Sequence, residues 1–247
     1  MKKCYLTFVL IVSFLLTACT EYEEILVDPP DDFSIINAKV INVNDDTIFL
    51  ADCDDENGLY QVTLTDDLGD LSDILKGDLI ELGFDGLIME SYPAMIANPS
   101  YIKLQEKGDD FVGLYLNIFM DLYNADSGLN SEVDLLAFDL SKDEILSQGE
   151  KNALIYMLQN ETQLSTCLAT FDELVSEDLI SVEDDTKFAF FDNGILFSIK
   201  TTSINNSKFE FSAQKWRSSM GAYFFDDATA KKKNGVWEYT VESYAIS

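Results

Sequence analysis

The stretch that decides the fold of this chain is Phe209-Glu210-Phe211-Ser212-Ala213-Gln214, in which apolar and polar side chains alternate strictly. A period of two places the apolar side chains on one face of a β-strand and the polar ones on the other. Trp237-Glu238-Tyr239-Thr240-Val241-Glu242 repeats the pattern. Two such strands predict a sheet with one buried face.

Turn signals around these strands predict an antiparallel meander. Asn234-Gly235 favours the positive backbone φ of a two-residue hairpin, and Asp192-Asn193-Gly194 and Asn205-Asn206 are further candidates. We expect four strands between these turns, over residues 195–204, 209–216, 220–230 and 236–246.

The residues before the meander have the pattern of helices. Between 111 and 123 the chain is apolar apart from one narrow polar stripe, which predicts a helix buried on most of its circumference. A strand is expected at 133–140. Capping boxes begin at Ser141, Ser147 and Thr170, and the last two predict helices over 148–159 and up to residue 176. Residues 108–247 therefore predict an α+β module with helices packed on an antiparallel meander, for which a cystatin- or NTF2-like cone is the first candidate.

Residues 34–107 predict a separate small β-module. Short strand-like stretches at 36–43, 47–51, 59–64, 79–84 and 101–104 are separated by turns rich in Gly and Asp. Five short strands in about 70 residues predict an OB-like five-stranded β-barrel. Fourteen acids against three lysines between residues 34 and 105 disfavour oligonucleotides as ligands of this module.

This module resembles a family of exported domains. The segments Lys76-Gly77-Asp78, Phe84-Asp85-Gly86 and Glu90-Ser91-Tyr92-Pro93-Ala94 are similar to small YobA-like lipoprotein domains of Gram-positive bacteria, the Firmicutes. Met95 departs from the family pattern, in which Gln is common at that place. The resemblance implies an exported, barrel-like module and carries no chemistry. Within it, Glu90, Tyr92 and Pro93 are candidates for a binding surface.

The N-terminus has the layout of a secretory signal peptide. Lys2 and Lys3 precede an apolar run over residues 5–16, and Leu16-Thr17-Ala18-Cys19 resembles the bacterial lipobox. We expect a lipoprotein signal peptide at 1–18, a lipid such as palmitate on Cys19, and an acidic tether over 19–33. These features predict a lipid-anchored protein on the extracytoplasmic side of the cell membrane, and the family resemblance implies a Gram-positive cell surface. An ordinary signal peptide with a chance cysteine is the alternative.

The charge of the chain limits the classes of partner that it can bind. The net charge is −29, there is no histidine, and 47% of the residues are apolar. Nucleic acid is excluded as a partner by charge, and Ser-His-Asp catalysis by the missing histidine. From Lys187 onward, however, eight basic residues meet only six acids. Lys215, Trp216 and Arg217 are therefore candidates for docking an anionic partner such as a wall polymer or an acidic peptide. The alternative is an ordinary surface that neutralises the rest of the molecule.

Three further patterns suggest chemistry. Asp52-x-Asp54-x-Glu56 has the spacing of a calcium loop, but Thr63 stands where a bidentate Glu belongs, which favours a solvated turn. Ser212-x-x-Lys215 matches a penicillin-binding motif, but on a strand the two side chains point to opposite faces. Cys53 and Cys167 either pair or remain free thiols.

These observations predict a non-enzymatic, membrane-tethered binding protein of the cell envelope that requires no cofactor and no metal. Its partner is the membrane, through Cys19, together with an envelope protein or polymer. Two alternatives stay open. One is a carboxylate-dependent hydrolase of envelope glycans, which needs two acids converging in a cleft. The other is a calcium-responsive extracellular module.

Overall fold

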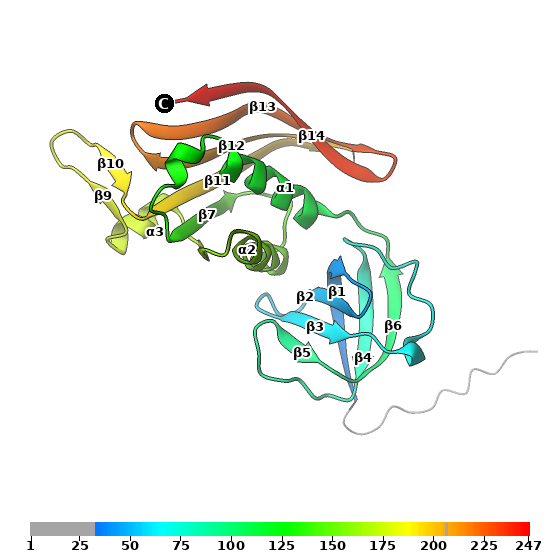
Figure 1. The fold of residues 1–247 in the computed structure, drawn as a ribbon. Helices are drawn as coiled ribbons and strands as arrows, with labels where there is room; N and C mark the ends of the chain where they lie inside the picture. Colours follow the sequence, from blue (N-terminus) through cyan, green and yellow to red (C-terminus); the bar gives the residue numbers. More distant parts are fainter. Residues whose placement is uncertain (1–32, 206) are drawn as a thin grey trace, which may run out of the picture.

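The computed structural model describes residues 33–205 and 207–247, which form two mixed β-sheets with three α-helices (Figure 1). The predicted signal peptide, Cys19 and nearly all of the acidic tether lie outside the described residues, and so these features stay predictions. None of the described helices combines the length and the apolar character that crossing a membrane requires.

The first sheet has six strands in the order β5-β3-β2-β1-β4-β6, with β3 and β5 parallel and the other pairs antiparallel. Its strands are β1 (Ser34–Val43), β2 (Thr47–Asp52), β3 (Leu59–Thr63), β4 (Leu79–Phe84), β5 (Ala94–Ile96) and β6 (Pro99–Glu106), with a 3-10 turn at Asp66–Leu68. The expected closed five-stranded barrel is therefore wrong, because the ladder has six strands and does not close. Only residues 97–98 separate the two edge strands, β5 and β6, and so the sheet must curl to bring its edges within about 11 Å of each other.

The second sheet has the order β14-β13-β12-β11-β7-β8. These strands are β7 (Leu135–Lys142), β8 (Ser165–Leu168), β11 (Gly194–Asn205), β12 (Lys208–Ser218), β13 (Gly221–Lys233) and β14 (Val236–Ile246). Two short strands complete the eight-stranded sheet off this path: β10 (Ala189–Phe191) pairs with β12, and β9 (Ile180–Val182) pairs with β10. The meander from β11 to β14 is antiparallel, as predicted, whereas β7 joins β11, and β8 joins β7, in parallel.

The turns that frame the meander follow the sequence only in part. Asn234 and Gly235 have φ of 52° and 86°, which confirms the hairpin predicted between β13 and β14. The hairpin predicted at Asp192-Asn193-Gly194 is wrong. The chain does turn there, but β10 (Ala189–Phe191) pairs with β9 (Ile180–Val182) and touches β12, and it does not pair with β11.

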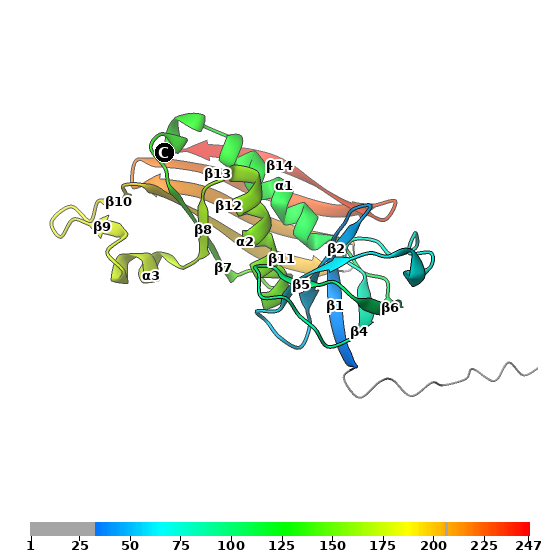
Figure 2. The same cartoon turned by 60° about the horizontal axis from the view of Figure 1, so that its bottom comes forward.

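Two of the predicted helices cover one face of the second sheet: α1 (Phe111–Asn124) and α2 (Gln148–Thr162) (Figure 2). The third, α3 (Phe171–Ser176), packs with β9 and β10 against the other face. The capping boxes at Ser147 and Thr170 both form. The one predicted at Ser141 does not form, because the backbone N–H of Glu144 donates to the hydroxyl of Thr201 and not to that of Ser141, which itself donates to Asp139.

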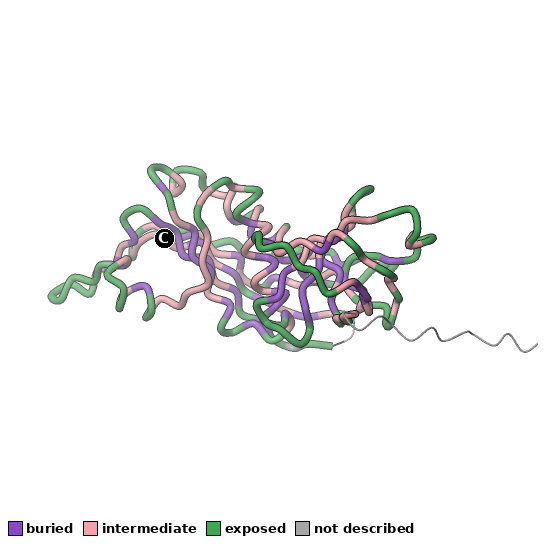
Figure 3. The backbone as a smooth tube through the Cα atoms, turned by 90° about the horizontal axis from the view of Figure 1, so that it is seen from below, coloured by how far each residue is buried: buried purple, intermediate pink, exposed green. Residues whose placement is uncertain are grey.

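The two sheets share a hydrophobic core through α2. Ile41, Ala51 and Leu59 of the first sheet belong to the same buried cluster as the phenylalanines beneath α1. Lys39 of β1 forms an ion pair of 2.9 Å with Glu150 at the start of α2. Buried residues therefore continue from one sheet into the other (Figure 3).

Candidate functional site

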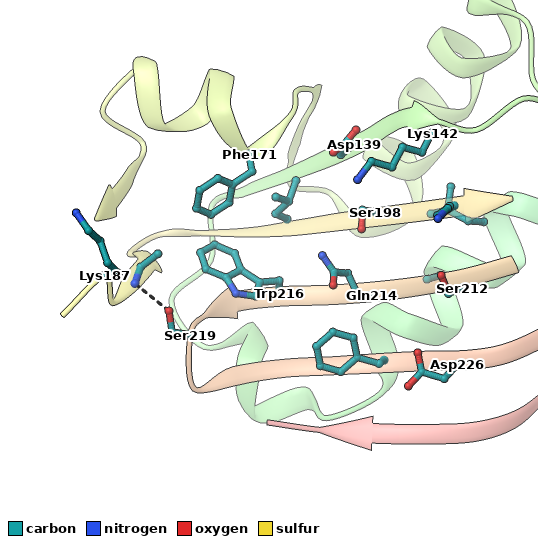
Figure 4. Close-up of a pocket in the computed structure, with 16 residues that line it drawn as sticks. Asp139, Lys142, Phe171, Lys187, Ser198, Ser212, Gln214, Trp216, Ser219 and Asp226 are labelled. Carbon is teal, nitrogen blue, oxygen red and sulfur yellow. Dashed lines mark hydrogen bonds between the residues drawn. The ribbon is translucent and has the colours of Figure 1, made fainter. Parts of the chain in front are cut away.

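A groove of about 650 Å³ lies on the face of the second sheet that α1 and α2 leave uncovered (Figure 4). Its floor comes from β7, β11, β12 and β13, and one end is walled by α3 and the segment around β10. We call this hollow the sheet groove.

Strand register builds the floor of the sheet groove. Asp139 of β7 lies opposite Ser198 of β11, which lies opposite Gln214 of β12, which lies opposite Phe224 of β13. Because every second residue of a strand points to the same face, these four side chains form one row across the sheet. All four are half-buried and line the sheet groove.

Two lysines stand opposite each other in the next row. Lys142 of β7 pairs in register with Lys200 of β11, and Lys187 approaches from the wall of the sheet groove. Directly opposed like charges destabilise a sheet. No ion pair is formed by any of these three lysines with the residues that the structure describes, although the whole chain has 45 acids for 16 basic residues. The sheet groove has three lysines against two aspartates, Asp139 and Asp226, and so it is weakly cationic on a strongly anionic protein.

The walled end of the sheet groove is aromatic. The rings of Phe171 and Trp216 meet edge to face, with centroids 5.3 Å apart. The capping box of Thr170 and Glu173 fixes the start of α3 and hence the position of Phe171. An apolar ring surface thus stands at one end of the sheet groove, and the row of Asp139, Ser198 and Gln214 lies between it and the two opposed lysines.

Lys215, a predicted docking residue, is fully buried on the opposite face of β12. Its Nζ donates to the backbone oxygens of Tyr123 at 2.9 Å, Ala125 at 2.7 Å and Asp126 at 3.2 Å, at the end of α1. Burial lowers the pKa of Lys215 to about 8, because the desolvation of the ammonium outweighs the attraction of Asp126. Lys215 therefore satisfies helix-end carbonyls that would otherwise be orphaned.

The side chains of the two other predicted docking residues, Trp216 and Arg217, point to opposite faces of β12, as strand alternation requires. Arg217 donates to the backbone oxygens of Leu129, Ser131 and Asp192, so that it ties two loops to the sheet. Trp216 lies between Lys215 and Arg217 in sequence, points to the opposite face, and lines the sheet groove. The motif Ser212-x-x-Lys215 is split in the same way.

The candidates Glu90, Tyr92 and Pro93 lie between β4 and β5, on the first sheet. The Tyr92 ring packs edge to face on Tyr156 of α2, with centroids 5.8 Å apart. Pro93 borders a small hollow of about 210 Å³ between the first sheet and α2. The structure therefore does not bring these three residues together with Lys215, Trp216 and Arg217.

The carboxylates of the sheet groove are not spaced as a glycosidase requires. Asp139 and Asp226 belong to β7 and β13, which are three strand spacings apart, or about 14 Å. Paired glycosidase carboxylates stand about 5 to 9.5 Å apart.

The buried acid Asp143 has a structural role. It accepts the hydroxyl of Tyr115 at 2.5 Å and the backbone N–H of Leu146. Burial, with Asp143 beside it, raises the pKa of Tyr115.

The predicted calcium spacing forms a turn. The Asp52 carboxylate accepts the backbone N–H of Asp54 at 2.8 Å, and within residues 33–205 and 207–247 no three acid or thiol side chains converge as a metal would need. Cys53 and Cys167 are both free thiols, and burial raises the pKa of each.

Lys142, Lys200 and Phe171 are site residues that sequence reasoning missed. Their only signal was the basic excess toward the C-terminus, which included Lys200 but not Lys142. No protein-family model, no curated protein and no solved structure matches this chain.

Proposed function

We propose that this chain is an exported, non-enzymatic binding protein of the cell envelope. A lipid on Cys19 holds it on the extracytoplasmic side of the cell membrane, and the sheet groove binds an anionic envelope polymer. The opposed pair Lys142 and Lys200, which forms no ion pair with residues 33–205 and 207–247, is the observation that carries the proposal. An anionic group between the two lysines relieves their repulsion.

The aromatic wall favours a polymer whose units also have an apolar face. Phe171 and Trp216 offer ring surface within the same groove as the lysines, and Gln214 and Ser198 offer hydrogen bonds. A phosphate- or carboxylate-bearing sugar combines these three features. The negative charge of the rest of the chain disfavours double-stranded nucleic acid, whose two strands together carry one charge per about 1.7 Å.

We also infer that the first sheet is a partly open relative of the OB fold. Three features support this: β1 pairs with both β2 and β4, β3 runs parallel to β5, and two residues link the edge strands. For the second sheet we infer a cystatin- or NTF2-like architecture, because α1 and α2 cover one face of its antiparallel meander.

Binding of a phosphate-bearing wall glycopolymer to the full chain tests the proposed function. The double substitution Lys142→Gln and Lys200→Gln should raise the Kd by about tenfold, and added salt should weaken wild-type binding. The matched control is Lys76→Gln with Lys103→Gln, because these lysines are also exposed and form no ion pair with the described part of the chain, but lie in the turn before β4 and on β6. Equal affinity of the two double variants contradicts the proposal, and binding of neutral dextran as tight as that of the glycopolymer does so as well.

A further inference from the structure

A second surface of the protein exposes aliphatic side chains to solvent. In the segment of residues 85–92, between β4 and β5, Leu87 is 68% exposed, Ile88 43% and Met89 47%. We call this segment the apolar loop. Single exposed apolar residues are common, but three in succession form a patch that calls for a partner.

The exposure of these side chains is built into the backbone of the apolar loop. The Asp85 carboxylate accepts the backbone N–H of Leu87 at 3.1 Å and the side-chain amide of Asn98 at 2.8 Å. Met89 and Met95 exchange two backbone hydrogen bonds, of 2.9 and 3.2 Å. The loop is thus held at both ends, with its aliphatic side chains pointing outward.

The apolar loop leaves the first sheet where the N-terminal segment enters it. Ser34, at the start of β1, pairs with Phe84, the last residue of β4, and so β1 begins where β4 ends (Figure 1). Ile35 follows at the same end and is 54% exposed. Between Cys19 and Phe33 the chain can span at most about 50 Å, and a flexible chain of that length averages about 20 Å. A lipid on Cys19 would therefore keep this end of the sheet close to the bilayer.

We propose that the apolar loop, together with Ile35, inserts into the surface of the lipid bilayer that holds the anchor. The proposal goes beyond the ligand of the sheet groove and rests on the lipid anchor of the proposed function. Moving aliphatic side chains from water to the acyl boundary of a bilayer lowers the free energy. Asp85 and Glu90 flank them, and so neutral headgroups suit this surface better than anionic ones.

Tryptophan quenching by lipid measures the insertion directly. Leu87→Trp is compared with Met220→Trp, a control at a residue that is 77% exposed on the second sheet, in the full chain mixed with phosphatidylcholine vesicles with brominated acyl chains. The two native tryptophans give the same background in both variants. We expect bromine to quench Leu87→Trp more strongly than Met220→Trp. Leu87→Ser with Ile88→Ser should lower vesicle partitioning by roughly tenfold.

The anchor and the insertion can fail separately. The same measurements are made on the chain purified from membranes and on the Cys19→Ser chain, each over a series of lipid concentrations. If both chains partition alike and the intact mass shows no acyl group, the anchor is refuted, and the quenching of the Leu87→Trp chain still decides the insertion. If Leu87→Trp is quenched no more than Met220→Trp at the highest lipid concentration, the insertion is refuted, whether or not the chain is anchored.

Discussion

Lys215 shows how a single charged residue can mislead when its place on a strand is unknown. Its neighbours in sequence suggested a basic docking face, but β12 turns Lys215 toward α1 and Trp216 toward the sheet groove. A buried ammonium is tolerated there because three carbonyls surround it.

Lys215→Met should lower the free energy of unfolding by about 1–3 kcal/mol, because the carbonyls at the end of α1 would lose their donor. Chemical denaturation at pH 7 measures the loss. The control is Lys76→Met, which removes an exposed lysine of the first sheet and should change stability by less than about 0.5 kcal/mol. Equal losses in the two variants would mean that the three contacts contribute nothing net.

The stability difference between the wild type and Lys215→Met should also depend on pH. The pKa of Lys215 is about 8 in the folded chain and 10.5 as a free side chain, so that between these values the unfolded state binds more protons. Stability then rises with pH. The free energy of unfolding of the wild type should therefore increase relative to that of Lys215→Met from pH 8 to pH 10. A difference that stays flat across this range contradicts the lowered pKa.

Long elements with a regular pattern were predictable, and short ones were not. The apolar run of α1, the capping boxes of α2 and α3, and the alternation of β12 and β14 each fix a local structure by themselves. β5, β9 and β10 have three residues each and β8 has four, too few to show a period. These strands exist because a partner strand is available, which only the tertiary fold supplies.

The two capping boxes permit a matched test of element stability against function. Ser147→Ala and Thr170→Ala each remove a capping hydroxyl and should each cost about 1 kcal/mol. Only Thr170→Ala loosens the helix that carries Phe171 into the wall of the sheet groove. We therefore expect weaker glycopolymer binding for Thr170→Ala and unchanged binding for Ser147→Ala, measured at a temperature where both are folded. The same Kd for both variants would show that α3 does not contribute to glycopolymer binding.

The sheet groove could not be predicted from the sequence, because it is a product of register across four strands. Lys142 and Lys200 are 58 positions apart, and they meet only because β7 inserts in parallel beside β11. Composition revealed a basic excess in the C-terminal part, but not which of its lysines lack acidic partners. The junction between the two sheets was equally invisible, since its residues read as ordinary core positions of separate modules.

That junction predicts that the two sheets unfold as one unit. Ile41, Ala51 and Leu59 of the first sheet are buried in the core of the second, and Lys39 neutralises Glu150, whose side chain is only 5% exposed. Lys39→Met leaves that carboxylate buried without its partner and should cost about 2 kcal/mol, less than a fully buried pair because Lys39 is itself 28% exposed. Calorimetry should show one transition, shifted to lower temperature as a whole.

The control for this junction is Lys233→Met, which breaks the exposed pair with Glu238 and should cost no more than about 1 kcal/mol. Because the Lys39–Glu150 pair joins β1 to α2, its loss is felt by both sheets, whereas the loss of Lys233 affects one hairpin. Two separate transitions in the wild type, or a Lys39→Met variant in which only the first sheet melts earlier, would show that the shared core does not couple the sheets. In that case the sheet groove and the apolar loop would move independently, and binding at one could not report on the other.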